Sequence, residues 1–455
     1  MLPTSVIAER VRQAIEARAL QGFVVDGLME RWEAARSNPE ELMRLHEYLG
    51  SLPMQAEWPY QEPSDLEGIR AAREPTPQPS MYLSEEEIED RIYGGWLGRV
   101  VGCILGKPLE VGYGQDEIRD YLEGADAYPL DDYVPSTSRT GRILRRDCVP
   151  SMRGFVRYAQ EDDDLNYMCL AIKLLERHGL RFTTLDVGLN WLESIPFMWT
   201  WGPEHSVYLN LATAVGEHYP EEIDLEQVTS YLNPGEELIG AQIRTDVYGY
   251  ICPGNPELAA TLAWKDAYLT HRKNGIYGAM WVAAMIAGAF ACQDIEQAIR
   301  VGLSQIPRRS RLREAIEQTI DWVKSGTSWQ DMGRLIQERF GKYGFAGAIN
   351  NACIVAASLM YGWGNGADPA SIIFERAITI AVQLGQDTDS NGATAGSVIG
   401  TMLGAHQLPE KWTAPIHDTL HTCVVGFGKE SIRSLAHRTY ELSRLTRWQG
   451  SSAQA

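Results

Sequence analysis

The most constraining feature of this sequence is a pair of glycine ladders, in which glycine recurs at every fourth residue. The ladders consist of Gly94, Gly98, Gly102 and Gly106, and of Gly392, Gly396, Gly400 and Gly404. A period of four places these glycines along one stripe of a helix. Each interior glycine costs about 0.8–1 kcal/mol relative to alanine, so close packing must compensate. We expect the two helices to pack on each other, although separate partners would also explain the pattern.

Segments with a period near 3.6 dominate the rest of the chain. Ser84 and Glu87 form a capping box that opens the first glycine-bearing helix, and Lys107-Pro108 closes it. The other main helical segments are expected at 6–20, 39–49, 165–177, 256–268, 275–292, 295–303, 311–323, 346–361, 371–384 and 391–403. Convincing alternating strands are absent, so the sequence predicts an all-α fold.

A proline-rich stretch divides the chain. The segment EPTPQPS at 74–80 places three prolines in five positions and is expected to be extended. We therefore expect an N-terminal helical extension and linker at 1–80 and a catalytic domain at 81–455. The length of 455 residues leaves ample material for a large core.

Composition excludes several classes of partner. The formal net charge of −19 disfavours binding to nucleic acid and to anionic membranes. No apolar signal-peptide core stands at the start, and the longest apolar run, 277–292, is too short to span a membrane. The seven cysteines include no CxxC pair, which is typical of a protein of the reducing cytoplasm.

Two acidic motifs stand at expected helix starts. The first is Glu161-Asp162-Asp163-Asp164, and the second is Asp387-Thr388-Asp389-Ser390. Each has an ordinary interpretation as helix capping or a turn. However, four consecutive like charges repel one another, and a hard divalent cation such as Mg²⁺, Mn²⁺ or Ca²⁺ would relieve that repulsion. Two such starts in one all-α chain favour a shared dinuclear site formed by Glu161, Asp162, Asp163, Asp387, Asp389 and Ser390.

These residues make the chain similar to the ADP-ribosylglycohydrolase family (dinitrogenase reductase activating glycohydrolase-like). Gly102 to Glu110 resembles the family's G-D-x-x-G-x-P-x-E motif, residues 161–164 stand where the family has T-D-D-T, and residues 386–390 where it has G-D-T-D-T/S. Thr270-His271 resembles a further "TH" step, and Arg244 to Gly249 falls where an arginine-to-glycine segment is common. The match spans most of residues 88–412.

The resemblance implies a compact, orthogonal multi-helix fold with two Mg²⁺ ions that bind ribose hydroxyls and position water at the anomeric carbon. The expected substrate is a ribose-containing small molecule or an ADP-ribosylated conjugate. Glu110 corresponds to the glutamate implicated in catalysis, and we assign the catalytic role to Glu110 and Asp163. The expected substrate-binding residues are Gly106, Arg145, Trp201 and His271. Without the motif, Glu110 would be interpreted as a solvated loop residue, Trp201 as a core residue and Arg145 as a partner of the acidic surface.

Departures from the family pattern indicate a divergent branch. Cys103 replaces an aspartate, Glu161 and Asp164 replace threonines, and Gln386 replaces a glycine. The two added acids should disfavour a pyrophosphate near the metals unless arginines offset them, so we favour a small ribosyl substrate over a modified protein. Two other hypotheses stay open: a non-catalytic member with a binding or structural role, and a metal-free glycosidase that uses Glu110 and one aspartate.

Overall fold

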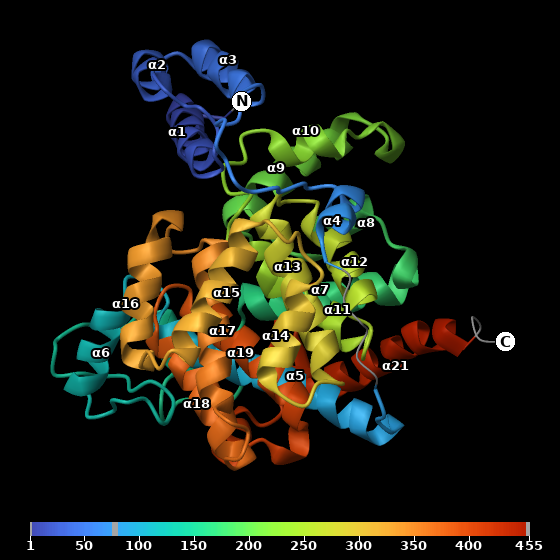
Figure 1. Cartoon of the computed structure of the whole chain (residues 1–455). Coiled ribbons are helices and arrows are strands. Elements are labelled where there is room, and N and C mark those ends of the chain that lie inside the picture. The colour runs from blue at the N-terminus through green and yellow to red at the C-terminus, as the bar shows by residue number, and fades with distance from the viewer. Residues whose placement is uncertain (1, 75–80, 452–455) are drawn as a thin grey trace.

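The computed structural model describes residues 2–74 and 81–451, and helices dominate it (Figure 1). The all-α prediction is confirmed. The described strands form a small hairpin, β1 (Thr419–His421) with β2 (Lys429–Ser431), which the sequence analysis missed. Of the expected extended segment 74–80, all but Glu74 lies outside the described residues.

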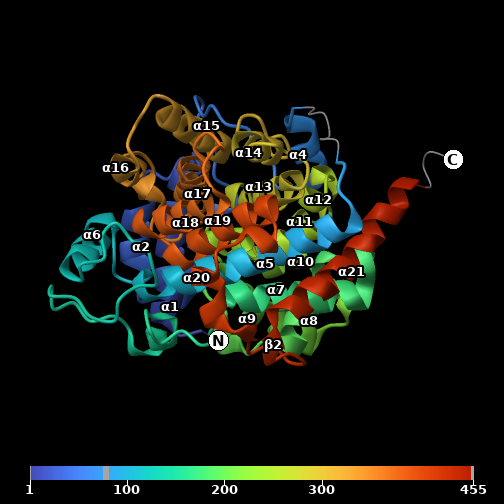
Figure 2. The same ribbon diagram turned by 90° about the horizontal axis from the view of Figure 1, so that it is seen from below.

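The centre of the molecule is the pair α5 (Glu85–Gly106) and α19 (Thr388–Leu403), which lie side by side (Figure 2). The prediction that the two ladders pack on each other is confirmed, and the helices run antiparallel. A Cβ atom added to Gly98 would overlap the carbonyl of Gly396, and Gly102 meets Gly392 in the same way. Helix backbones approach this closely only when no side chain separates them.

The ends of the ladders differ from the regular pattern. Gly94 meets Gly400, but Gly106 meets the backbone of Thr388 rather than a glycine. Gly404 lies one residue beyond α19 and has a φ of 84°, a conformation that glycine adopts without strain and that ends the helix.

Apolar helices enclose this pair. All 16 residues of α13 (Asn274–Ala289) and all 16 of α19 are buried, which explains why both are rich in alanine and glycine. Besides α13, the helices that pack on the pair are α7 (Asp163–His178), α17 (Ala348–Trp363), α18 (Ala370–Gln383) and α21 (Ile432–Ser451). Outside them, α11 (Asp246–Tyr250), α12 (Pro256–Ala267) and α14 (Ile295–Leu303) pack on α13, and α15 (Arg311–Lys324) packs on α17. The remaining helices of the body are α6 (Gln115–Gly124), α8 (Thr184–Ser194), α9 (Gly202–Glu217), α10 (Leu225–Ser230), α16 (Trp329–Phe340) and α20 (Glu410–Thr413). No helix among the described residues is both long and apolar enough to cross a bilayer.

The N-terminal residues form a small unit of their own. Helices α1 (Thr4–Leu20), α2 (Leu28–Ala35) and α3 (Pro39–Leu49) surround a separate core and project from the body (Figure 1). The following segment packs on the body instead, because Glu62 forms a 2.8 Å ion pair with buried Arg311 and Ile69 of α4 (Leu66–Ala72) joins the main core. The extension thus has a projecting part, α1–α3, which contacts the body through the 3.1 Å ion pair of Arg18 with Glu236, and a part that packs along the body.

The glycine packing yields a test by single methyl groups. Gly98→Ala should lower the free energy of unfolding by about 1–3 kcal/mol, because the new Cβ forces α5 and α19 apart. The matched control is Gly216→Ala in α9, where a Cβ meets no atom within 4 Å, so the stability should be unchanged or slightly higher. Chemical denaturation of both variants measures the difference, and equal stability of the two would contradict the packing account.

Candidate active site

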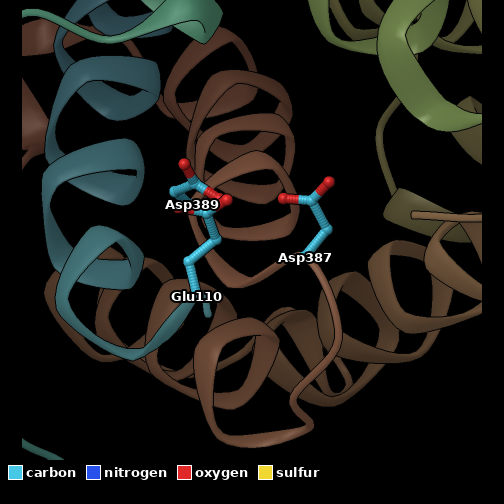
Figure 3. A group of neighbouring side chains, drawn as sticks. All are labelled: Glu110, Asp387 and Asp389. Carbon is cyan, nitrogen blue, oxygen red and sulfur yellow. The ribbon is translucent and has the colours of Figure 1, made fainter. Parts of the chain in front are cut away.

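The glycine contact brings the second acidic motif to the end of the first glycine-bearing helix. Thr388 donates a 2.8 Å hydrogen bond from Oγ1 to the carbonyl of Gly106, so the start of α19 lies against the end of α5. Glu110 follows the short 3₁₀ turn Lys107–Leu109. The carboxylates of Glu110, Asp387 and Asp389 consequently point toward one another and offer oxygens within 4.8 Å (Figure 3).

The first acidic motif reaches the same place through two buried cations, Arg99 on α5 and Lys107 in the turn after it. Arg99, fully buried, donates to Oδ1 of Asp164 at 2.8 Å and also pairs with Asp246 at 2.9 Å. Lys107 forms an ion pair with Asp162 and donates to the carbonyl of Glu161 at 3.0 Å. These cations hold the motif in place; Lys107 compensates Asp162, and Arg99 is shared between Asp164 and Asp246.

A hydroxyl joins the two acidic motifs directly. Ser390 Oγ donates a 3.0 Å hydrogen bond to Oδ2 of Asp164. Asp162, Asp163 and Asp164 form a second group of carboxylates whose oxygens lie within 4.8 Å, beside the group of Glu110, Asp387 and Asp389. The two motifs, more than 200 residues apart, therefore meet in one site.

The convergence forms the floor of a cleft of about 580 Å³. Its lining includes all six residues expected to hold metal ions, together with Glu110, Arg145 and Trp201. Arg145 lies beside Glu110, with 3.5 Å between Nη1 and Oε2, and also pairs with Asp147 at 3.0 Å. Trp201 is 60% exposed and stands at the rim rather than in the core.

Two expected substrate-binding residues lie away from the cleft surface. Gly106, the last residue of α5, is buried against the start of α19. Because Thr388 covers it, it does not line the cleft. His271 is fully buried; its Nδ1 lies 2.7 Å from Thr270 Oγ1 and 3.7 Å from Glu204 Oε1. Burial, with the nearby charges of Arg244 and Arg272, lowers the pKa of His271, which keeps its imidazole neutral.

Glu204 is a cleft residue that the sequence analysis did not single out. Its carboxylate lines the cleft and is bound from behind by Arg244, whose guanidinium also pairs with Asp266. His271 lies behind Glu204, so the "TH" step supports this wall from the interior. A lone glutamate in the helix start 202–204 carries no signal in the sequence, because only the tertiary fold brings it to the cleft.

The departures from the family pattern have local explanations. Cys103 is buried beside the first motif, and burial together with Asp162 and Asp164 raises the pKa of its thiol, so the residue is a neutral thiol where an aspartate would add charge. Gln386 has a φ of 65°, a region in which glycine is favoured, and its side chain accepts a 3.3 Å hydrogen bond from Asn350. Asp164 is paired with Arg99, which it shares with Asp246, and it is not among the residues that line the cleft.

The remaining carboxylates carry a marked electrostatic cost. Burial, followed by the charges of Asp389 and Asp162, raises the pKa of Glu110 to about 9. Burial and neighbouring carboxylates likewise raise the pKa of Asp163, Asp387 and Asp389. Oδ1 of Asp389 is buried without a hydrogen-bond partner among the described residues. An oxygen-rich, over-negative site with an unpartnered carboxylate oxygen fits a divalent cation.

The fold is all-α, and it gathers carboxylates from helix ends around one cleft. Such a cluster is a candidate site for acid-base catalysis or metal binding. Residues 84–449 match the family described as ADP-ribosylglycohydrolase, so the chain belongs to this family. Membership supports a glycosyl hydrolase activity. A solved structure described as "ADP-ribosylglycohydrolase-related protein complex" is similar over 79% of this chain and 99% of that one, at 16% identity and a TM-score of 0.48. No curated protein matches the sequence.

The raised pKa of Glu110 predicts how stability depends on pH. The pKa of Glu110 is about 9 in the folded chain, against an ordinary value of 4.5. Without bound cations, protonated Glu110 therefore contributes fully to stability in acid, and this contribution is lost as the pH rises from 4.5 to 9. The melting temperature of chelator-treated protein should therefore fall from pH 5.5 to 8.5, and Glu110→Gln should flatten the profile. Saturating Mg²⁺ or Mn²⁺ should raise the melting temperature by a few degrees, and more at pH 8.5. A cation effect that is zero, or larger at pH 5.5, would contradict this electrostatic account.

Proposed function

We propose that the protein is a divalent-cation-dependent hydrolase that cleaves a ribosyl glycosidic bond in an ADP-ribosyl conjugate or a small ribose-containing glycoside. The observation that carries the proposal is the convergence of Glu110 and both acidic motifs on the floor of one cleft. Family membership gives the reaction class. Arg145 and Trp201 at the rim are suited to contact the substrate beyond its ribose.

The chemistry of the donor set supports a cation at this place. Asp162, Asp163, Asp387 and Asp389 would hold two Mg²⁺ ions, with Glu161 and the Ser390 hydroxyl beside them, and Mn²⁺ or Ca²⁺ suits the same oxygens. When bound, such ions would orient a vicinal diol and water and stabilise developing negative charge.

The chain's own side chains have distinct tasks in this proposal. Glu110 holds or moves a proton at its carboxyl oxygens, and in the cation-free site burial beside other carboxylates raises its pKa. Lys107 and Arg99 keep Asp162 and Asp164 in place. The residues at the floor of the cleft orient the ribose relative to Asp163 and Glu110, so that substrate binding also positions the reacting groups.

Hydrolysis assays test the proposal with matched acidic variants. The substrates are ADP-ribosyl-arginine, ADP-ribosyl-serine and a set of N-ribosides, each with Mg²⁺ and after chelation. Asp389→Asn and Glu110→Gln should each lower kcat/KM at least 100-fold, since one removes a proposed ligand and the other the proton carrier. Asp120→Asn on the exposed surface of α6 should leave it unchanged.

Three outcomes would contradict the proposal. Absence of hydrolysis of every ribosyl substrate by metal-loaded wild-type protein would favour a binding or structural role. Full activity after chelation would favour a glycosidase that needs no cation. Unchanged activity in both site variants would place the reaction elsewhere.

A further inference from the structure

The two groups of carboxylates at the floor of the cleft differ in how free their oxygens are. Glu110, Asp387 and Asp389 form one group, which we call the open group, and their side chains point toward one another (Figure 3). Asp389 is 3% exposed, and its Oδ1 has no hydrogen-bond partner within the described part of the chain. A buried carboxylate oxygen that no protein group satisfies is a ready ligand for a cation.

In the other group, protein donors already occupy Asp162. Oδ1 of Asp162 accepts a 3.0 Å hydrogen bond from the backbone N–H of Asp164, which caps α7. Oδ2 of Asp162 forms an ion pair with the ammonium of Lys107. A divalent ion that binds Asp162 therefore has to compete with a positive charge that the chain itself supplies.

The contact between the glycine-bearing helices fixes the position of Lys107. Gly106 packs directly on the backbone of Thr388, and Lys107 is the next residue along the chain. The Lys107 side chain is 8% exposed, and its Nζ also donates a 3.0 Å hydrogen bond to the carbonyl of Glu161. Because the Asp162 side chain is only 2% exposed, separating the pair would leave a buried charge without its partner. Lys107 is therefore a strong competitor for Asp162.

The other cation of the cleft does not protect the open group in the same way. Among the described residues that line the cleft, eight are acids and two, Lys107 and Arg145, are cations. The Arg145 side chain lies 3.5 Å from Glu110 and is 39% exposed, so water can replace this contact at little cost. An ion at the open group consequently breaks no buried ion pair, whereas an ion at Asp162 breaks one and repels the displaced ammonium.

We propose that Lys107 makes the two cation positions of the cleft unequal. The ion at the open group binds tightly, and the ion that uses Asp162 binds weakly because it has to displace the Lys107 ammonium. Until that second ion binds, the ammonium keeps Asp162 in place and supplies part of the missing positive charge. The inference rests on the proposed function and deepens it, since filling of the weaker position would set the cation concentration at which hydrolysis begins.

Titration of the full chain with Mn²⁺ tests this inference without an activity assay. Electron paramagnetic resonance of the free ion gives the number of bound ions and their dissociation constants. Wild-type protein should bind one ion at least about tenfold more tightly than a second. Asp162→Asn should abolish only the weaker binding, and Asp389→Asn should abolish the tighter one. Asparagine is a good helix N-cap, so Asp162→Asn keeps the cap on α7.

Lys107→Met is the decisive variant, and Arg145→Met is its matched control. Methionine keeps most of the length of the lysine side chain without its charge, so the ratio of the two dissociation constants should fall at least about tenfold. Arg145→Met removes the other cation from the lining of the same cleft, beside the open group, so the ratio should stay the same or rise. Should Lys107→Met fail to fold, Lys107→Gln gives the same test and keeps a donor for the Glu161 carbonyl.

Thermal melts give a second measurement on the same variants. In chelator, Lys107→Met should melt below the wild type, because Asp162 loses its partner. Saturating Mn²⁺ should then raise the melting temperature of Lys107→Met by more than that of the wild type. An equal increase in the two proteins would contradict competition between the lysine and the ion.

The outcomes separate this inference from the proposed function. Two ions of equal affinity in wild-type protein, or an unchanged ratio in Lys107→Met, would overturn the inference and leave the proposed function standing. A fall of the ratio that is as large in Arg145→Met would also overturn it, because the effect would then be one of general charge. If wild-type protein binds no Mn²⁺, the inference and the cation dependence of the proposed function fail together. If the ions bind as inferred but no ribosyl substrate is hydrolysed, the inference stands and the proposed function fails.

Discussion

Direct backbone contact between α5 and α19 is the constraint on which the rest of the structure depends. Gly98 and Gly396 meet without side chains between them, and this contact fixes both the distance and the register of the two helices. This register places the Thr388 hydroxyl within hydrogen-bond distance of the Gly106 carbonyl. Two loops that are far apart in sequence, one with Glu110 and one with Asp387, therefore occupy the same place. The glycines destabilise both helices, but the site requires them because only glycine allows this contact.

Charge compensation decides which acids of the site are available for chemistry. Asp164 is paired with Arg99, which also pairs with Asp246, and it accepts a hydrogen bond from Ser390, so it joins α5, α7 and α19. Asp162 has a cation beside it in Lys107. Glu110, Asp387 and Asp389 have raised pKa values because their negative charges are buried together. The site thus combines a structural set of paired acids with a strained set that a divalent cation would relieve.

Much of this arrangement could be predicted from the sequence because its signals are periodic or local. The glycine period predicted the helix pair, and the capping box at Ser84 correctly placed the start of α5. Most predicted helices lie within a few residues of the observed ones, since apolar periodicity reports the buried face. The hairpin at 419–431 escaped notice because its strands have three residues each.

Long-range partners could not be predicted in this way. Arg99 lies within an apolar helix, and nothing local indicates that it pairs with Asp164 and Asp246 across the core. The position of His271 behind Glu204 likewise depends on how α9 and α12 pack against the body. The cavity between α1 and the turn at 342–344 is lined by segments that share no sequence signal. Such features follow from tertiary geometry rather than from pattern.

The most direct test of the central claim is anomalous diffraction from crystals of the protein grown with Mn²⁺. The account predicts a manganese peak within ligand distance of a carboxylate from residues 161–163 and, directly or through a second ion, of a carboxylate from Asp387 or Asp389. It also predicts that the peak stands at the floor of the cleft beside Glu110. A manganese position bound by one motif alone, or the absence of manganese from the cleft at saturating concentration, would contradict the claim that the glycine contact assembles a shared cation site.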